Sequence, residues 1–195
     1  MNIGVLALQG AVAEHMRSIE LAGGTGIAVK KTEQLADIDG LIIPGGESTT
    51  IGKLMRKYEF IEAIRHFSSK GKPIYGSCAG LIVLAERISG GEEPHLGLMD
   101  ITVARNAFGR QRESFETALR LKGLDEEIQA VFIRAPLIEA AGPEVEILAS
   151  YDGQIVAARQ GHLLVSSFHP ELTEDISFHR FFLDMVIEAA TSNIQ

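Results

Sequence analysis

The chain of 195 residues contains one cysteine and no tryptophan. A single cysteine excludes an internal disulfide framework. The N-terminal segment MNIGVLALQG has neither a basic region nor a small-residue cleavage site behind a long apolar stretch, so no signal peptide is predicted. These absences favour a reducing cytoplasm as the location of the protein.

Long hydrophobic runs and an excess of positive charge are also missing. The apolar run GLIVLA ends at Glu86 and Arg87, well short of the roughly 18 to 20 residues that span a bilayer. The formal net charge is -8 at pH 7 and the pI is about 5.3. Nucleic-acid binding normally requires a basic patch that displaces counterions. We therefore expect a soluble protein that binds neither membrane nor nucleic acid, and the charge leaves a basic or neutral protein partner open.

Short apolar runs alternate with longer amphipathic runs through the first half of the chain. Strands are predicted at residues 3–8, 26–30, 40–46 and 73–77, and helices at 11–24, about 49–69 and 79–86. Fully apolar strands separated by helices indicate a parallel sheet that is covered on both faces.

The pattern changes after Ile101, where apolar and polar residues alternate as they do in hairpins. The segment YDGQ (151–154) is typical of a tight Asp-Gly turn, and residues 175–191 form an amphipathic helix whose inward face consists of Phe178, Phe181, Phe182, Met185 and Val186. We predict an α/β fold of three layers for residues 1–195, interpreted as one domain. Its central sheet is mostly parallel, with helices on both faces and antiparallel additions in the C-terminal half.

The only cysteine lies in the segment GSCAG (76–80), where an apolar strand meets a helix. This arrangement resembles a nucleophile elbow, in which a sharp turn lifts the central side chain clear of the sheet and flanking glycines relieve clashes. A helix N-terminus also favours the thiolate form of Cys78. Free cysteine is more often a small buried hydrophobe, but this setting favours a nucleophile.

A nucleophilic thiol requires a base and a group that orients the base. The segment SSFHPELTED supplies His169 and Glu171. Pro170 disfavours the α region for His169, and in an extended segment residues i and i+2 point to the same side. An isolated His-x-Glu is more often a solvated strand end. This pair therefore indicates a catalytic role only in combination with the Cys78 elbow.

A glycine loop, IIPGGESTT (42–50), follows another apolar strand. Ser48, Thr49 and Thr50 are candidate N-caps for the next helix. If the N–H groups of Gly46 and Ala79 converge, they form an oxyanion hole for attack on a carbonyl carbon. An ordinary glycine turn is the main alternative, and a phosphate cradle is disfavoured because neither G-K-[ST] nor G-x-G-x-x-G is present.

The motifs GGEST, GSCAG and FHPEL together resemble the class I glutamine amidotransferases of the triad type, over the whole chain. Within that superfamily, GVLALQGAVAEH at the start, RNAFGRQ (105–111) and VFIRAP (131–136) are similar to the glutaminase subunits of pyridoxal 5′-phosphate synthase. The resemblance implies hydrolysis of L-glutamine to glutamate and ammonia, delivery of the ammonia to a separate synthase subunit for vitamin B6 synthesis, and activity that depends on docking to it.

The resemblance also implies roles for individual residues. Cys78 would be the nucleophile, His169 the base and acid, and Glu171 the group that orients it. The bound glutamine would contact the residues Gly46, Glu47, Ser48, Arg105, Ile133 and Arg134, the last three at its α-carboxylate. No cofactor is required, because pyridoxal phosphate would be a product of the whole complex.

The sequence does not decide which arginine binds the α-carboxylate of glutamine. Arginine matches a carboxylate with its planar fork, and the candidates are Arg105, Arg110, Arg112 and Arg134. The remaining histidines have no metal-ligand spacing, so no metal is assigned, and His15 is a candidate for facing a partner. Two other functions stay open: a binding module with this fold and no turnover, and a cysteine hydrolase of other amides or peptides.

Overall fold

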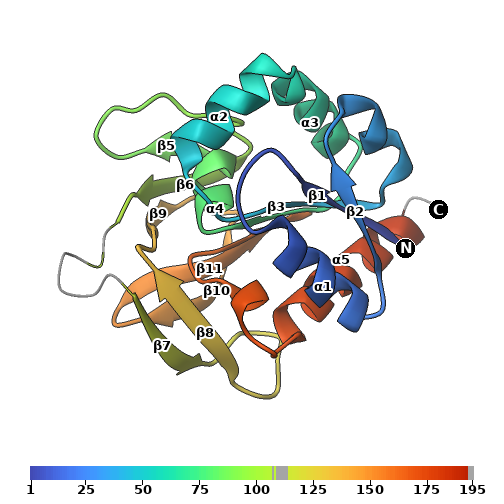
Figure 1. Cartoon of the computed structure of the whole chain (residues 1–195). Coiled ribbons are helices and arrows are strands. Elements are labelled where there is room, and N and C mark those ends of the chain that lie inside the picture. The colour runs from blue at the N-terminus through green and yellow to red at the C-terminus, as the bar shows by residue number, and fades with distance from the viewer. Residues whose placement is uncertain (107, 109–113, 193–195) are drawn as a thin grey trace.

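A ten-stranded mixed sheet forms the centre of the computed structural model, which describes residues 1–106, 108 and 114–192 (Figure 1). Its strands are β1 (Asn2–Leu6), β2 (Thr25–Val29), β3 (Gly40–Ile43), β4 (Ile74–Ser77), β5 (Ala85–Ile88), β6 (Met99–Ala104), β9 (Leu137–Ala141), β10 (Glu146–Tyr151), β11 (Gln154–Gln160) and β12 (Leu163–Ser166). The strand order is β2-β1-β3-β4-β12-β11-β9-β6-β5, with β10 paired to β11. A separate antiparallel hairpin consists of β7 (Ser114–Leu119) and β8 (Ile128–Ile133).

The sheet divides, as predicted, into a parallel half and an antiparallel half, except that the edge strand β5 pairs in parallel with β6. Strands β2, β1, β3, β4 and β12 are parallel neighbours. Antiparallel pairing begins where β11 joins β12 and continues through β9 and β6. At the predicted Asp-Gly turn, Tyr151 pairs with Gln154, and both Asp152 (φ 51°) and Gly153 (φ 76°) adopt the left-handed conformation that a two-residue hairpin requires.

Helices cover both faces of the parallel half (Figure 1). They are α1 (Val12–Leu21), α2 (Ser48–Lys57), α3 (Phe60–Ser69), α4 (Ala79–Leu84) and α5 (Ser177–Ser192), with 3-10 turns η1 (Thr32–Asp37) and η2 (Pro170–Leu172). Successive strand residues alternate between two cores: Leu41 and Ile43 pack with α2 and α3, whereas Ile42 packs on the side of α1 and α5. The three-layer α/β prediction is therefore confirmed.

Two local predictions are wrong. The single helix expected at about 49–69 is two helices, because Tyr58 ends α2 and Glu59 adopts a left-handed φ of 63° before α3 begins. The helix expected at 79–86 stops at Leu84, and the backbone of Ala85 turns extended (ψ 141°) to start β5, which pairs with β6. Among the described residues, no helix has the length and apolar character needed to cross a membrane.

Candidate active site

Cys78 occupies the sharp turn between β4 and α4. Its backbone has φ 52° and ψ -101°, a region that non-glycine residues rarely adopt. A Cβ atom on Gly76 would clash with the carbonyl of Gly80, and one on Gly80 would clash with the carbonyl of Ile43. Both glycines are thus required by the close approach of strand and helix, which is the elbow geometry that the sequence predicts.

His169 and Glu171 lie at the same sheet edge as Cys78. Strands β4 and β12 are parallel and pair Ser77 with Ser166, so the segments that follow both strands emerge together. The Cys78 N–H donates to the Ser166 carbonyl at 2.8 Å. A Cβ atom on Gly45 would lie 2.5 Å from His169 Cε1 and 3.5 Å from Cys78 Cβ, so glycine alone fits against both side chains.

The contact between His169 and Glu171 has a different origin from the one expected. Glu171 lies in the 3-10 turn η2, which begins at Pro170, and not in an extended segment. The turn still brings Glu171 Oε1 to 2.6 Å from His169 Nδ1. This contact leaves the second ring nitrogen of His169 free to face the thiol.

Burial and partners act against each other on the pKa of His169. Burial alone would lower it, but hydrogen bonding with Cys78 and Glu171 and their charges outweigh burial and raise the pKa to about 10. The Glu171 carboxyl has the opposite shift: burial raises its pKa, and the nearby His15 and His169 more than offset that effect and lower it. A protonated His169 beside an ionised Glu171 is the charge state that these shifts favour.

The glycine loop after β3 is held by the turn at residues 9–11. The Gly45 carbonyl accepts from the Ala11 N–H at 3.2 Å, and the Glu47 N–H donates to Gln9 Oε1 at 2.9 Å. The N-cap of α2 is Glu47, and not one of the three hydroxyl residues predicted, because its carboxylate accepts from the N–H groups of Thr49 and Thr50. Hydrogen bonding by Thr50 is the main reason that the pKa of Glu47 falls to about 2.

A cavity of about 260 Å³ opens beside the thiol, and its size suits a ligand no larger than an amino acid. It is lined by Gly46, Glu47, Ser48, Cys78, Ala79, Ile82, Arg105, Asn106, Arg134 and Pro136. The fold therefore brings together most of the residues predicted for substrate binding. Ile133 is the exception, because it is not among the lining residues, although its carbonyl accepts from Cys78 Sγ at 4.0 Å.

The two described candidate arginines differ in how firmly they are held. Arg105 Nη2 donates to Glu92 Oε1 and to Thr49 Oγ1, and its Nη1 lies 3.6 Å from Glu47 Oε1. Arg134 is exposed and has a left-handed φ of 43°. The other two candidates, Arg110 and Arg112, lie outside the described residues. Over the described parts of the chain, no group of three or more His, Cys, Asp or Glu side chains could hold a metal ion.

A sequence model of the SNO glutamine amidotransferase family matches residues 5–188. The chain belongs to this family. Among curated members, the pyridoxal 5′-phosphate synthase subunit PdxT of Niallia circulans is 70% identical over 189 residues, covering 97% of this chain and 100% of the relative. The subunit of the same name from Geobacillus sp. (strain WCH70) is 62% identical, covering 97% and 98%.

A solved crystal structure of a glutamine amidotransferase superposes on this chain with a TM-score of 0.90 at 48% identity. The match covers 94% of this chain and 98% of the other. The family resemblance and the fold class inferred from the sequence are therefore confirmed, and the chain is a glutamine amidotransferase homologue over nearly its whole length.

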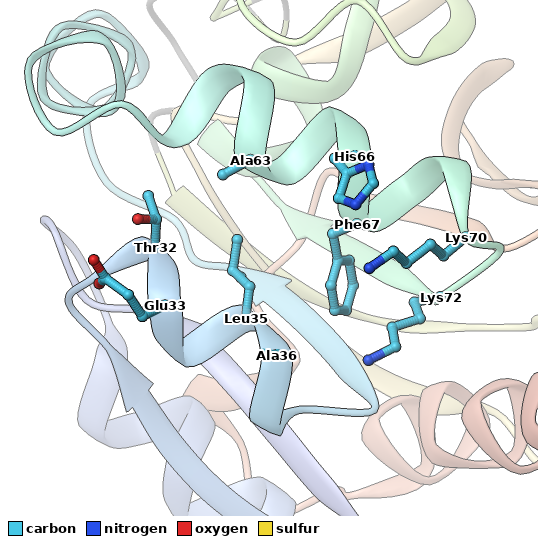
Figure 2. A pocket seen from close by; sticks show the side chains of 9 residues that line it. All are labelled: Thr32, Glu33, Leu35, Ala36, Ala63, His66, Phe67, Lys70 and Lys72. Atoms are coloured by element: carbon cyan, nitrogen blue, oxygen red, sulfur yellow. The ribbon is translucent and has the colours of Figure 1, made fainter.

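This SNO family member has a second hollow, between η1 and α3 (Figure 2). It is lined by Thr32, Glu33, Leu35, Ala36, Ala63, His66, Phe67, Lys70 and Lys72. Lys72 already donates to the Ile38 carbonyl at 2.7 Å and lies over the Phe67 ring. This hollow shares no residue with the Cys78 cavity and contains none of the predicted site residues.

Two buried histidines behind the predicted triad residues were missed. His15, expected to face a partner, is fully buried in α1, and its Nδ1 lies 2.8 Å from Nε2 of His179, which is fully buried in α5. His15 precedes the buried Ile19 by four residues, and His179 precedes the buried Leu183 by four. Helical periodicity therefore placed both histidines on apolar faces, a signal that could have been used.

We expect His179 to make the folded protein less stable in acid. In the unfolded chain His179 takes up a proton below pH 6.5, whereas burial and the neighbouring His15 lower its pKa in the folded protein to about 3. The unfolded state therefore binds more protons between these values, and the free energy of unfolding falls as the pH falls. At pH 5 this loss is about 2 kcal/mol.

Urea unfolding at pH 8 and pH 5 measures this loss. The variant His179→Phe is expected to reduce the difference between the two free energies of unfolding by about 2 kcal/mol. Replacing the exposed His66 with Phe is the control and leaves the difference unchanged. An unchanged difference in His179→Phe would mean that His179 is protonated in the folded state.

Proposed function

We propose that the chain is the glutaminase subunit of a pyridoxal 5′-phosphate synthase. It hydrolyses L-glutamine to L-glutamate and ammonia and delivers the ammonia to a synthase subunit. The observation that carries the proposal is Cys78, a thiol in a cavity wall at an elbow, next to the buried His169–Glu171 pair. Support also comes from relatives named as subunits of this synthase, which match 97% of the chain.

The reaction is acyl transfer through a covalent intermediate. The Cys78 thiolate attacks the carboxamide carbon of glutamine, and the N–H groups of Gly46 and Ala79 stabilise the negative oxygen that forms. Protonated His169 gives its proton to the departing nitrogen as the C–N bond breaks, and ammonia leaves. A γ-glutamyl thioester remains on Cys78.

Water completes the cycle. His169, now neutral, removes a proton from a water molecule that attacks the thioester carbon, and the C–S bond breaks to release glutamate and regenerate the thiolate. Glu171 holds the imidazole through its Nδ1 at 2.6 Å and stabilises the imidazolium. No cofactor or metal takes part in these steps.

The cavity also suggests how glutamine is oriented. Gly46, Glu47 and Ser48 line the cavity, and we assign them to contacts along the bound glutamine. We assign the α-carboxylate end to Arg105 with the Ile133–Arg134 segment. Glu92 and Thr49 fix the Arg105 guanidinium, which leaves less freedom to lose on binding.

The variant Arg105→Lys is expected to raise the KM for glutamine by about tenfold, with a smaller change in kcat. Lysine keeps the charge but loses the planar fork that binds a carboxylate through two N–H groups. Steady-state ammonia release measures both constants. Arg159→Lys, a change at a surface arginine paired with Glu188, is the control. A KM equal to that of the control would remove Arg105 from the carboxylate site.

The same proposal includes the partner of the protein, its cellular location and its domain organisation. A free-running glutaminase would waste glutamine, so we propose that docking to the synthase subunit activates the chain in a heteromeric complex. The cytoplasm is the proposed location, and residues 1–195 are proposed to form one glutaminase domain, supported by a family match over residues 5–188.

Ammonia release from glutamine by the chain alone and with a pyridoxal 5′-phosphate synthase subunit tests the function. We expect release that is strong only with the partner. No release in either condition, from folded protein, would favour a binding module without turnover. Release from other amides or from peptides in preference to glutamine would favour a general cysteine hydrolase.

A further inference from the structure

The two carboxylate oxygens of Glu171 have different partners. Oε1 contacts His169 Nδ1 at 2.6 Å. Oε2 lies 3.5 Å from His15 Nε2 and accepts from Ser77 Oγ at 3.5 Å. The Glu171 side chain is fully buried, so these protein groups replace the water that would otherwise surround the carboxylate.

His15 joins Glu171 to a second histidine. Its Nδ1 lies 2.8 Å from His179 Nε2, whereas its Nε2 makes no hydrogen bond and lies 3.5 Å from Glu171 Oε2. His179 Nδ1 is also buried without a hydrogen-bond partner. His169, Glu171, His15 and His179 therefore form one continuous buried chain that links η2, α1 and α5.

Only one arrangement of protons suits the contacts among these four side chains. Burial lowers the pKa of His15 and, together with His15, lowers that of His179 to about 3, so both rings are neutral at pH 7. A neutral imidazole has one donor and one acceptor nitrogen. If His15 carried its proton on Nδ1, its Nε2 lone pair would face the Glu171 carboxylate. With protons on Nε2 of both rings, His179 donates to His15 Nδ1, and the Nε2–H of His15 faces the Glu171 carboxylate across 3.5 Å.

We propose that His15 is a positioning residue of the glutaminase. The Nε2–H of His15 holds Glu171 Oε2, and His179 fixes the tautomer of His15. This proposal rests on the proposed function. By holding Oε2, His15 keeps Oε1 aimed at His169 Nδ1, and the other nitrogen of His169 stays aimed at the Cys78 thiol. A carboxylate held by one contact would rotate, and a misplacement of about 1 Å can cost about a hundredfold in rate.

Nuclear magnetic resonance of the full chain labelled with ¹⁵N-histidine tests the proton arrangement without substrate. The chain has six histidines, and spectra of His15→Gln and His179→Phe identify the two signals. Long-range ¹H–¹⁵N couplings at pH 7 distinguish the tautomers. We expect the Nε2–H tautomer for both rings. An Nδ1–H tautomer or a cationic ring at His15 would overturn the proposal.

Kinetics with the synthase partner tests the positioning role. His15→Leu is expected to lower kcat for ammonia release by roughly tenfold to a hundredfold with KM changed by less than about twofold. His15→Gln keeps one donor and one acceptor and is expected to recover most of the rate. The control His162→Leu removes a hydrogen bond to Ser68 remote from the site and leaves kcat unchanged.

A double variant separates positioning from a general loss of packing. Because His179 acts through His15, adding His179→Phe to His15→Leu is expected to leave kcat unchanged, whereas independent packing defects would multiply. Equal kcat in His15→Leu and His162→Leu, or no recovery in a folded His15→Gln protein, would overturn the role of His15. Wild-type protein that releases no ammonia with the partner would instead overturn the proposed function.

Discussion

Replacing Cys78 with alanine is expected to abolish ammonia release from glutamine, with kcat lowered by about a millionfold as for other nucleophiles held in a triad. The sulfur forms the bond to the substrate, and no neighbouring group in the cavity lining offers a second thiol. Alanine keeps the Cβ atom at the elbow, so folding and docking of the synthase subunit are expected to be unchanged. Coupled detection of ammonia measures the rate.

Covalent labelling gives an independent measure for the same variant. Cys78 is the only cysteine of the chain, so uptake of one glutamine-like electrophile, detected by intact-protein mass spectrometry, reports on this side chain alone. We expect labelling of the parent protein and none of Cys78→Ala. Ammonia release near the parental rate from Cys78→Ala would contradict its role as nucleophile.

The second large effect is expected at His169. His169→Asn removes the group that moves every proton of the reaction, whereas Glu171→Gln keeps a buried side chain of the same shape that still contacts the imidazole. We expect a loss in kcat of about a millionfold for His169→Asn and of about ten-thousandfold for Glu171→Gln. Ammonia release with the synthase subunit measures both.

The matched control for this pair is Glu174→Gln, a carboxylate in the same segment whose side chain is 83% exposed. It is expected to retain the parental rate. If His169→Asn and Glu171→Gln both behaved like this control, the proposed triad would be wrong. A loss at Glu171 larger than that at His169 would reverse the proposed roles.

The parallel half of the fold was predictable because its strands are continuous apolar runs between amphipathic helices. The break between α2 and α3 was not, since Tyr58 and Glu59 continue the helical pattern and only the left-handed backbone of Glu59 interrupts it. Strand β5 was missed for a related reason. Ala85 and its neighbours read as the end of a helix, and pairing with β6, a contact between distant segments, decides the outcome.

The site was predictable at positions where the backbone geometry requires glycine. Gly76 and Gly80 mark the elbow because a Cβ atom fits at neither position. The Glu47 cap was missed because a longer side chain competes with hydroxyl residues for the same N–H groups. Helical periodicity indicates that His15 and His179 are buried, but their contact with each other was not predictable, because a single sequence does not reveal which buried helix faces meet.

The backbone of Cys78 places stability and reactivity in opposition. A left-handed conformation at a residue with a side chain costs about 1 to 3 kcal/mol, and here it is located at the atom that the proposed chemistry requires. Selection for heat resistance alone would favour glycine at position 78, because glycine adopts this conformation without strain. A thiol at this position therefore carries a cost in stability, and Cys78→Gly is expected to relieve the backbone strain while removing the proposed nucleophile.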